Sequence, residues 1–168
     1  MSVDSVKGLP EVSKIGGAVE ERYDYTAAVT YAAGDLIRIN TVGTISLALL
    51  TANGAVHGVA LEAGVAGEVA KVMLFADDTV VSIPCEDSLA PSTLKKGLTY
   101  ALATGSATGV WAVNSSVTNP IATVVGYAGD GQPWDDAYSS FDEDPAVANN
   151  RVMVRFKQSV LDATVAAV

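Results

Sequence analysis

Few residues of this chain could do chemistry, and their spacing fits no complete catalytic arrangement. Ser92 and Lys95 have the Ser-x-x-Lys spacing of a serine nucleophile with a lysine base. That chemistry also needs Ser-Asp-Asn and Lys-Thr-Gly elements, and neither occurs in the sequence. His57 is the single histidine, which excludes a His-rich metal site and an HExxH helix. A Ser-His-Asp triad is formally possible, but the adjacent Gly58 in an apolar strand favours a hydrogen-bonded structural histidine.

The remaining candidate groups are a lone thiol and a cluster of carboxylates. Cys85 is the single cysteine, so there is no internal disulfide framework, and we predict a small buried hydrophobe because no base stands near it. The acidic segment 129–150 has oxygen ligands for Ca²⁺ but lacks the EF-hand order. No phosphate-binding glycine loop is present. The sequence therefore predicts no enzyme, no cofactor and no metal site.

Segment 129–150 is instead the leading candidate for contact with a partner. It interleaves aromatic rings with carboxylates in a loop long enough to be functional. Rings supply buried anchors at interfaces, and carboxylates find basic partners. A solvated loop that folds back on its own domain is the alternative. The candidate partner-binding residues are Trp134, Tyr138, Phe141, Asp135 and Asp136, together with Trp111, Tyr23 and Tyr25.

Two stretches of similar pattern are expected to position these groups. Each has a glycine turn entering a strand, then small residues, a second strand, and an alternating exit strand that ends in Phe. The first stretch spans 33–75 and the second 96–156, with His57-Gly58 matched to Val125-Gly126. This pattern predicts a β-module that occurs twice. Chance similarity between strands rich in Val, Ala and Gly is the alternative.

The chain as a whole predicts an all-β fold, a barrel or sandwich built from two similar β-modules with little helix. Short strands bounded by Gly, Asn or Asp recur with turn signals between them, as in all-β domains. Residues 151–156 alternate as a half-buried strand does. A helix is expected at 159–168, and one turn at 86–95. The predicted parts are an extended arm at 1–22, β-modules at 23–90 and 91–156, and a C-terminal tail at 157–168.

Charge and composition limit the partners. The formal net charge of −9 comes from 19 acidic and 10 basic residues among 168, without a basic cluster, so nucleic acid and anionic membranes are excluded as partners. No signal peptide or apolar membrane span is visible. Two stretches, 39–61 and 97–129, contain no charged residue. Either these faces are covered, by each other or by neighbouring subunits, or they form a meander that uses Thr, Ser and Asn as its polar residues.

Four motifs of the chain are centred on glycines. They are Ala33-Gly34-Asp35 entering a strand, Gly58 to Gly64, Ala66-Gly67-Glu68-Val69, and the Lys95 to Tyr100 turn. These motifs resemble those of small tailed-bacteriophage head decoration proteins, also called cement proteins. The likeness covers roughly residues 25–156, and the segments 129–150 and 157–168 have no counterpart in the family.

The resemblance implies a β-rich domain on the outside of a capsid shell, where it fastens adjacent capsomers as a trimer or other small oligomer. It carries over no catalytic residue. The expected partners are the major capsid protein and further copies of the chain, and the expected location is the virion exterior after synthesis in the host cytoplasm. The alternatives are a tail, fibre or baseplate component, or a carbohydrate-binding β-domain that uses Trp134, Asp135 and Asp136.

Overall fold

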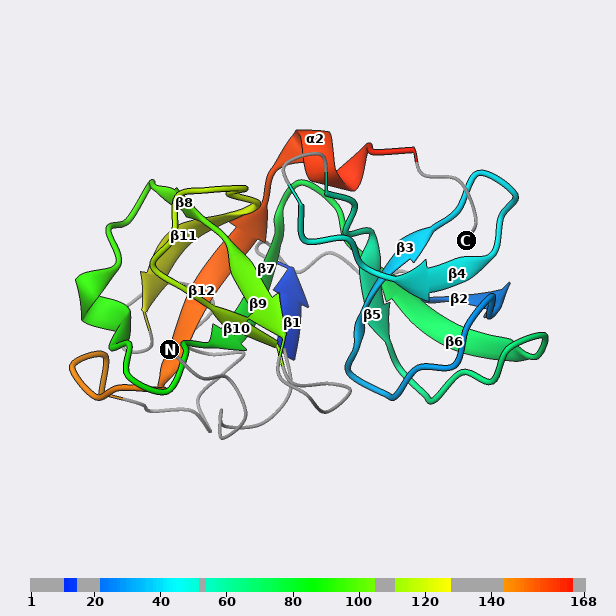
Figure 1. Cartoon of the computed structure of the whole chain (residues 1–168), viewed down its shortest axis with the longest axis horizontal. Coiled ribbons are helices and arrows are strands. Elements are labelled where there is room, and N and C mark those ends of the chain that lie inside the picture. The colour runs from blue at the N-terminus through cyan, green and yellow to red at the C-terminus, as the bar shows by residue number, and fades with distance from the viewer. Residues whose placement is uncertain (1–10, 15–21, 52–53, 105–110, 128–143, 165–168) are drawn as a thin grey trace.

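The fold is all-β, as predicted from the sequence. The structure, a computed structural model, describes residues 11–14, 22–51, 54–104, 111–127 and 144–164. Within these ranges the strands pair in antiparallel fashion in three sheets, which form two lobes side by side (Figure 1). Helix is limited there to the 3-10 turn η1 (Pro91–Thr93), inside the expected segment 86–95, and the single-turn helix α2 (Gln158–Leu161), which begins one residue before the expected segment 159–168.

The first sheet builds the right-hand lobe of Figure 1. Its strand order is β2-β6-β5-β3-β4. Short strands separated by glycine turns dominate it, and Gly34, Gly43 and Gly67 all have positive φ. Beyond β2, Ala27 forms a parallel bridge with Ile45 of β4, which brings the two edges of the sheet together at this end. The strands are β2 (Arg22–Thr26), β3 (Leu36–Ile39), β4 (Ile45–Leu47), β5 (Gly58–Ala60) and β6 (Val69–Leu74).

The second five-stranded sheet lies in the left-hand lobe, and its order is β1-β7-β12-β11-β8. A two-stranded sheet continues it, because β9 follows β8 after one residue. Cys85, just after β7, forms a parallel bridge with Val113 of β10. The strands are β1 (Glu11–Lys14), β7 (Thr79–Pro84), β8 (Thr99–Tyr100), β9 (Leu102–Thr104), β10 (Trp111–Val113), β11 (Ala122–Tyr127) and β12 (Arg151–Phe156).

The two five-stranded sheets have corresponding strand orders. Strands β2, β6, β5 and β3 of the first sheet match β7, β12, β11 and β8 of the second. The backbone hydrogen bonds follow the same match. Gly34 N–H donates to Ala60 in one sheet, and Gly97 N–H donates to Val124 in the other, both at 2.8 Å. These two glycines have φ of +85° and +83°. The turns at 34 and 97 therefore share the same backbone geometry, whereas the duplication of a β-module stays a prediction.

The structure adds to or corrects the sequence expectations at three strands. The arm 1–22 was expected to be extended and shows no strand periodicity in its sequence, but it contains β1, which pairs with β7. The Gly58 strand was matched to Gly126, but Gly58 stands opposite Leu74 as Ala122 stands opposite Phe156, so the match is displaced by four residues (126 against 122). Strand β12 is not half-buried, since Met153 on its second face is fully buried.

The boundary between the two sheets also differs from the expected one. Strand β7 was assigned to the first β-module, 23–90. It pairs with β1 and β12 in the second sheet, so, apart from β1, the two sheets divide the chain between Leu74 and Thr79. Residues after β7 bind this sheet too, because Cys85 N–H donates to Asn150 and Glu86 N–H donates to Val113.

Two apolar cores hold the lobes and meet at their junction. The smaller core lies on the first sheet and includes Ile37, Ile45 and Val72. The larger core lies on the second sheet and also takes Leu36 of β3. At the junction the rings of Phe75 and Phe156 stack with centroids 5.5 Å apart. Helix α2 lies above the junction in Figure 1 and adds Val160 to the larger core.

Candidate docking surface

Two of the predicted contact residues lie together on the edge strand β2. The rings of Tyr23 and Tyr25 have centroids 6.3 Å apart. Both stand on the face of β2 that carries Ala70 and Val72 on the neighbouring strand, which is the face of the smaller core. Tyr25 is half-buried against that core, whereas Tyr23 is 43% exposed. Tyr23 is therefore the aromatic ring of this pair that a partner can reach.

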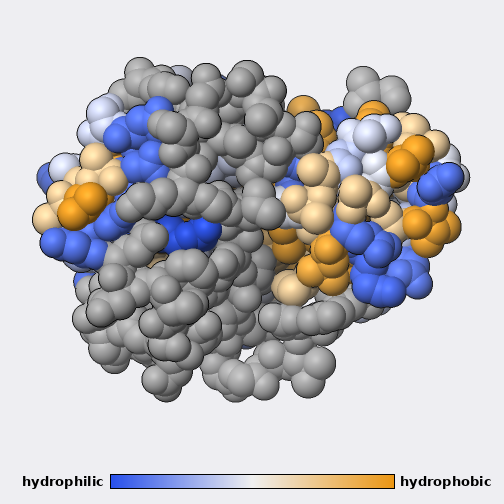
Figure 2. Space-filling view, turned by 90° about the horizontal axis from the view of Figure 1, so that it is seen from below, coloured by the Kyte–Doolittle hydropathy of each residue, from blue (hydrophilic) through white to orange (hydrophobic). Residues whose placement is uncertain are grey.

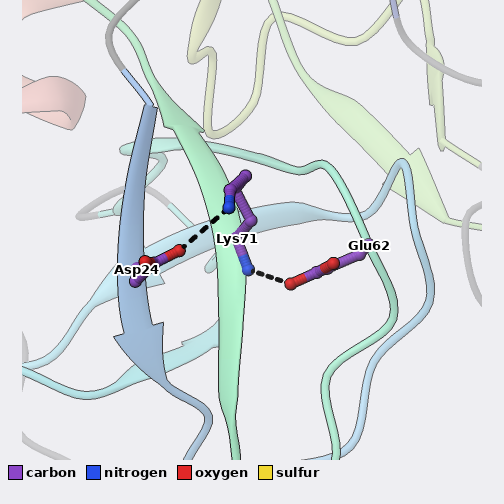
Figure 3. A network of polar contacts seen from close by, with 3 residues as sticks. All are labelled: Asp24, Glu62 and Lys71. Atoms are coloured by element: carbon purple, nitrogen blue, oxygen red, sulfur yellow. Dashed lines mark hydrogen bonds and ion pairs between the residues drawn. The ribbon is translucent and has the colours of Figure 1, made fainter.

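A polar group occupies the opposite face of the same strands (Figure 3). Asp24 lies between the two tyrosines in sequence, and its Oδ1 is 3.3 Å from Nζ of Lys71 on β6. The backbone N–H of Lys71 donates to Oε1 of Glu62 at 2.7 Å. Because both side chains of the ion pair are exposed, the pair adds little stability, but it places one positive and one negative charge beside the edge of the sheet.

The turn before β6 sets the position of this surface. Gly67 has φ of +89°, a conformation that favours glycine, and its N–H donates to the carbonyl of Ala27 at 2.8 Å. Ala27 N–H donates back to the carbonyl of Glu68 at 2.8 Å. This exchange ties the end of β2 to the start of β6 and leaves Val65 and Val69 exposed nearby. Figure 2 shows hydrophobic residues interspersed with hydrophilic ones over this lobe, on the right of the view.

Trp111, in contrast, is a core residue and not a surface anchor. It is 3% exposed, and its indole Nε1–H donates to Oδ1 of Asp35 at 2.9 Å. Asp35 is itself 1% exposed and belongs to the turn that enters β3 in the other lobe. The prediction that Trp111 contacts a partner therefore fails on accessibility. Sequence reasoning missed the buried aspartate, because 76 residues separate the two side chains.

Most of the predicted acidic insertion lies outside the described residues. This holds for its five candidate contact residues, which stay predictions. The end of the insertion is described, and it is anchored on the segment after β7. Ser92 N–H donates to the carbonyl of Pro145 at 2.8 Å, and Asn149 Nδ2 donates to Oδ1 of Asp87 at 2.8 Å. These contacts hold the exit of the insertion beside η1. The residues concerned are Trp134, Asp135, Asp136, Tyr138 and Phe141.

The two uncharged stretches are largely covered by the chain itself. Most described residues of 39–61 and 97–129 are buried or half-buried. In the first stretch the exposed positions include the turn with Val42, and in the second they include Leu98 and Val117. Internal burial therefore explains most of the missing charge.

A pocket of about 320 Å³ lies where the C-terminal segment crosses the first sheet, and His57 lines it with Asn40 and Asp162. His57 Nδ1 accepts a hydrogen bond from Ile39 N–H at 2.7 Å. The expected hydrogen-bonded structural histidine is therefore confirmed. Burial lowers the pKa of His57, against a smaller opposing effect of the Ala163 backbone.

Among the described residues, the thiol of Cys85 is a further group that was singled out in the sequence. Cys85 is fully buried, as predicted. Among the described residues no three His, Cys, Asp or Glu side chains gather closely enough to hold a metal ion. In the same part of the chain no helix is long and apolar enough to cross a membrane. Protein-family models and curated protein sequences were both compared with the chain, and neither comparison gave a match.

Proposed function

We propose that the chain is a virion structural protein that binds the outside of an assembled tailed-phage capsid and stabilises contacts between major capsid subunits. The proposal is carried by the resemblance to decoration proteins. Three of its four motifs coincide with turns at positive-φ glycines, namely Gly34, Gly67 and Gly97. These turns begin β3, β6 and β8, so the residues that carry the likeness are the ones that build the two sheets.

The physical requirements of that role agree with the composition of the chain. A protein that binds only the assembled shell stabilises the shell by mass action, and many small copies add their effects. A net charge of −9 keeps such a protein from binding packaged or stray nucleic acid. The proposed partners are the major capsid protein and further copies of this chain. The proposed location is the capsid exterior, without a catalytic role.

The first test is the mass of the purified full-length chain by light scattering, together with its sedimentation alongside full and empty tailed-phage heads. The proposal predicts a small oligomer that sediments with heads in hundreds of copies per head. A few copies per particle would instead indicate a tail, fibre or baseplate component. A chain that stays in the supernatant with both kinds of head refutes the proposal.

A second test separates the contact surfaces. Replacing Trp134, Tyr138 and Phe141 together by alanine is expected to weaken head binding at least tenfold, because buried aromatic anchors dominate interface energies. The matched control replaces Val42 and Val117, exposed residues outside the insertion, by alanine and should leave head binding unchanged. Thermal unfolding of both variants reports whether the fold is intact. Equal head binding by the two variants removes the insertion from the interface.

The arm can be tested without disturbing the sheet. Because β1 (Glu11–Lys14) pairs with β7, a deletion of residues 1–22 would strip a strand from the second sheet. Deleting residues 1–10 keeps β1 and is the appropriate variant. The proposal predicts weaker head binding by this variant at an unchanged melting temperature. Unchanged head binding shows that residues 1–10 make no contact with the shell.

A further inference from the structure

His57 ties the end of β3 to the C-terminal segment 158–164. On one side, its Nδ1 accepts a hydrogen bond from Ile39 N–H at 2.7 Å. On the other side, the imidazole makes a hydrogen bond to the backbone of Ala163, and this bond raises the pKa of the ring, so the ring is its donor. Because Nδ1 is already an acceptor, the donating group is Nε2–H. Both bonds therefore require the neutral ring with its proton on Nε2.

The C-terminal segment depends on such contacts with the rest of the chain. Helix α2 is a single turn, and its N-cap residue, Lys157, makes no side-chain cap hydrogen bond. A single helical turn is not stable by itself in water. Val160 is buried and its carbonyl accepts from Val56 N–H at 3.2 Å, but Asp162 beyond it is exposed. The bond from His57 therefore holds the part of the segment that follows Val160.

Protonation of His57 is incompatible with this arrangement. An imidazolium has an N–H on both ring nitrogens, so Nδ1–H would face Ile39 N–H and leave two donors without an acceptor. The ring must then turn away from Ile39, which also withdraws Nε2–H from Ala163. A positive charge already lies close by, because Arg38 precedes Ile39 on β3 and is 3% exposed. Its Nε is buried without a hydrogen-bond partner among the described residues.

We propose that His57 is a pH-dependent latch: the neutral imidazole fastens segment 158–164 to the first sheet, and the imidazolium releases it. The segment forms one wall of the pocket of about 320 Å³, opposite Leu74 and Phe75. Release opens this pocket and frees Leu161, which packs against the larger core. Acid therefore exposes covered apolar surface without unfolding either sheet. The latch does not depend on the capsid proposal.

Two charged residues act on His57 from the elements packed around it. Burial is the largest cause of its lowered pKa, and the charge of Arg38 lowers the pKa further, whereas the charge of Asp162 raises it. Arg38→Gln should therefore move release to higher pH, and Asp162→Asn should move it to lower pH, each by up to about one pH unit. The control Lys95→Gln removes an exposed cation of the second lobe and should leave the pH of release unchanged.

Amide hydrogen exchange of the full-length chain, corrected for intrinsic exchange rates, follows the latch from pH 7.5 to one unit below the folded pKa of His57. His57 is the single histidine, so an NMR titration of its ring gives that pKa directly. One unit below it the neutral ring has fallen to about one tenth, so protection of the Ile39 and Leu161 amides should fall about tenfold. The amide of Val124, which donates to Leu98 in the second sheet, should keep its protection.

His57→Gln separates the latch from other effects of acid. A glutamine carbonyl can accept from Ile39 N–H and does not titrate, so this variant should keep both amides protected over the same range. Thermal unfolding at pH 7.5 checks the fold of every variant. Equal loss of protection in His57→Gln and the wild type overturns the proposal, as does constant protection of the wild type through the His57 titration. Simultaneous loss at Val124 would mean global unfolding and overturns it too. Release that moves in the same direction in the two charge variants is equally incompatible with the latch.

Discussion

The contact between Asp35 and Trp111 is expected to be a main source of coupling between the two lobes. Oδ1 of Asp35 accepts from Trp111 Nε1–H at 2.9 Å, and Oδ2 accepts from Ala32 N–H at 2.9 Å. Asp35→Ala removes both bonds and leaves a buried indole N–H without its acceptor. A hydrogen bond to a carboxylate contributes about 1.5–3 kcal/mol, so the loss of two should cost about 3–6 kcal/mol. That is a large part of the roughly 5–15 kcal/mol by which a domain is stable.

Urea unfolding, followed by tryptophan fluorescence and far-UV circular dichroism, measures this loss. The matched control is Asp77→Ala, which removes an exposed carboxylate and should change the free energy of unfolding by less than about 0.5 kcal/mol. A double-mutant cycle with Trp111→Phe should give a coupling energy above about 0.5 kcal/mol, because the two side chains are in contact. A loss below about 1 kcal/mol for Asp35→Ala, or a coupling energy near zero, refutes the role assigned to this hydrogen bond.

Three further predictions concern single residues. Burial lowers the pKa of His57 below its usual 6.5, so the folded state binds the imidazole proton less tightly than the unfolded state does. The free energy of unfolding should therefore fall as the pH drops from 6.5 through the folded pKa. His57→Gln should make this fall smaller, as measured by urea unfolding at pH 7.5 and 5.5. Burial raises the pKa of Glu86 above 4.5, with a smaller contribution from Asp87 in the same direction. The stability due to this carboxyl group therefore falls as the pH rises from 4.5 through the folded pKa. Glu86→Gln should unfold at a higher urea concentration than the wild type at pH 7, and an unchanged unfolding midpoint contradicts the reasoning. A Cβ at Gly64 would overlap the ring of Tyr31, so Gly64→Ala should lower the free energy of unfolding in urea by about 1–3 kcal/mol. The control Gly67→Ala places its Cβ in open space and should lower that free energy by about 1 kcal/mol, because Gly67 has a positive φ. Equal losses in the two variants would show that the Tyr31 ring moves aside.

The strands that the sequence predicted well carry their signal locally. The segment 36–39 is a run of β-forming residues that follows a glycine turn, and 69–74 alternates before a pair of aspartates. Both segments are strands, β3 and β6. Strand β1 carries no such signal, because Glu11 to Lys14 is polar and short. It is a strand because β7 supplies the hydrogen-bonding partner.

Sequence alone also could not separate the buried from the exposed candidate contact residues. Their residue types single out Trp111 and Tyr23 equally well as anchors. The structure separates them by exposure, 3% against 43%, and nothing next to Trp111 in the sequence marks its partner Asp35. The displaced match of Gly58 with Gly126 has a related cause. Both are small residues in apolar strands, and strand register is set by pairing with β6 and β12 rather than by residue type.

The sequence by itself determined the all-β class, the positions of the positive-φ turns at Gly34 and Gly97, and the acidic surface charge. These follow from backbone freedom, strand propensity and composition, which act within a few residues of the chain. Only the tertiary structure decided that β1 covers β7, that Trp111 is buried against Asp35, and that the ring of Tyr23 is exposed. Strand pairing and burial join residues far apart in the sequence, and no local pattern records which partner will cover a given strand.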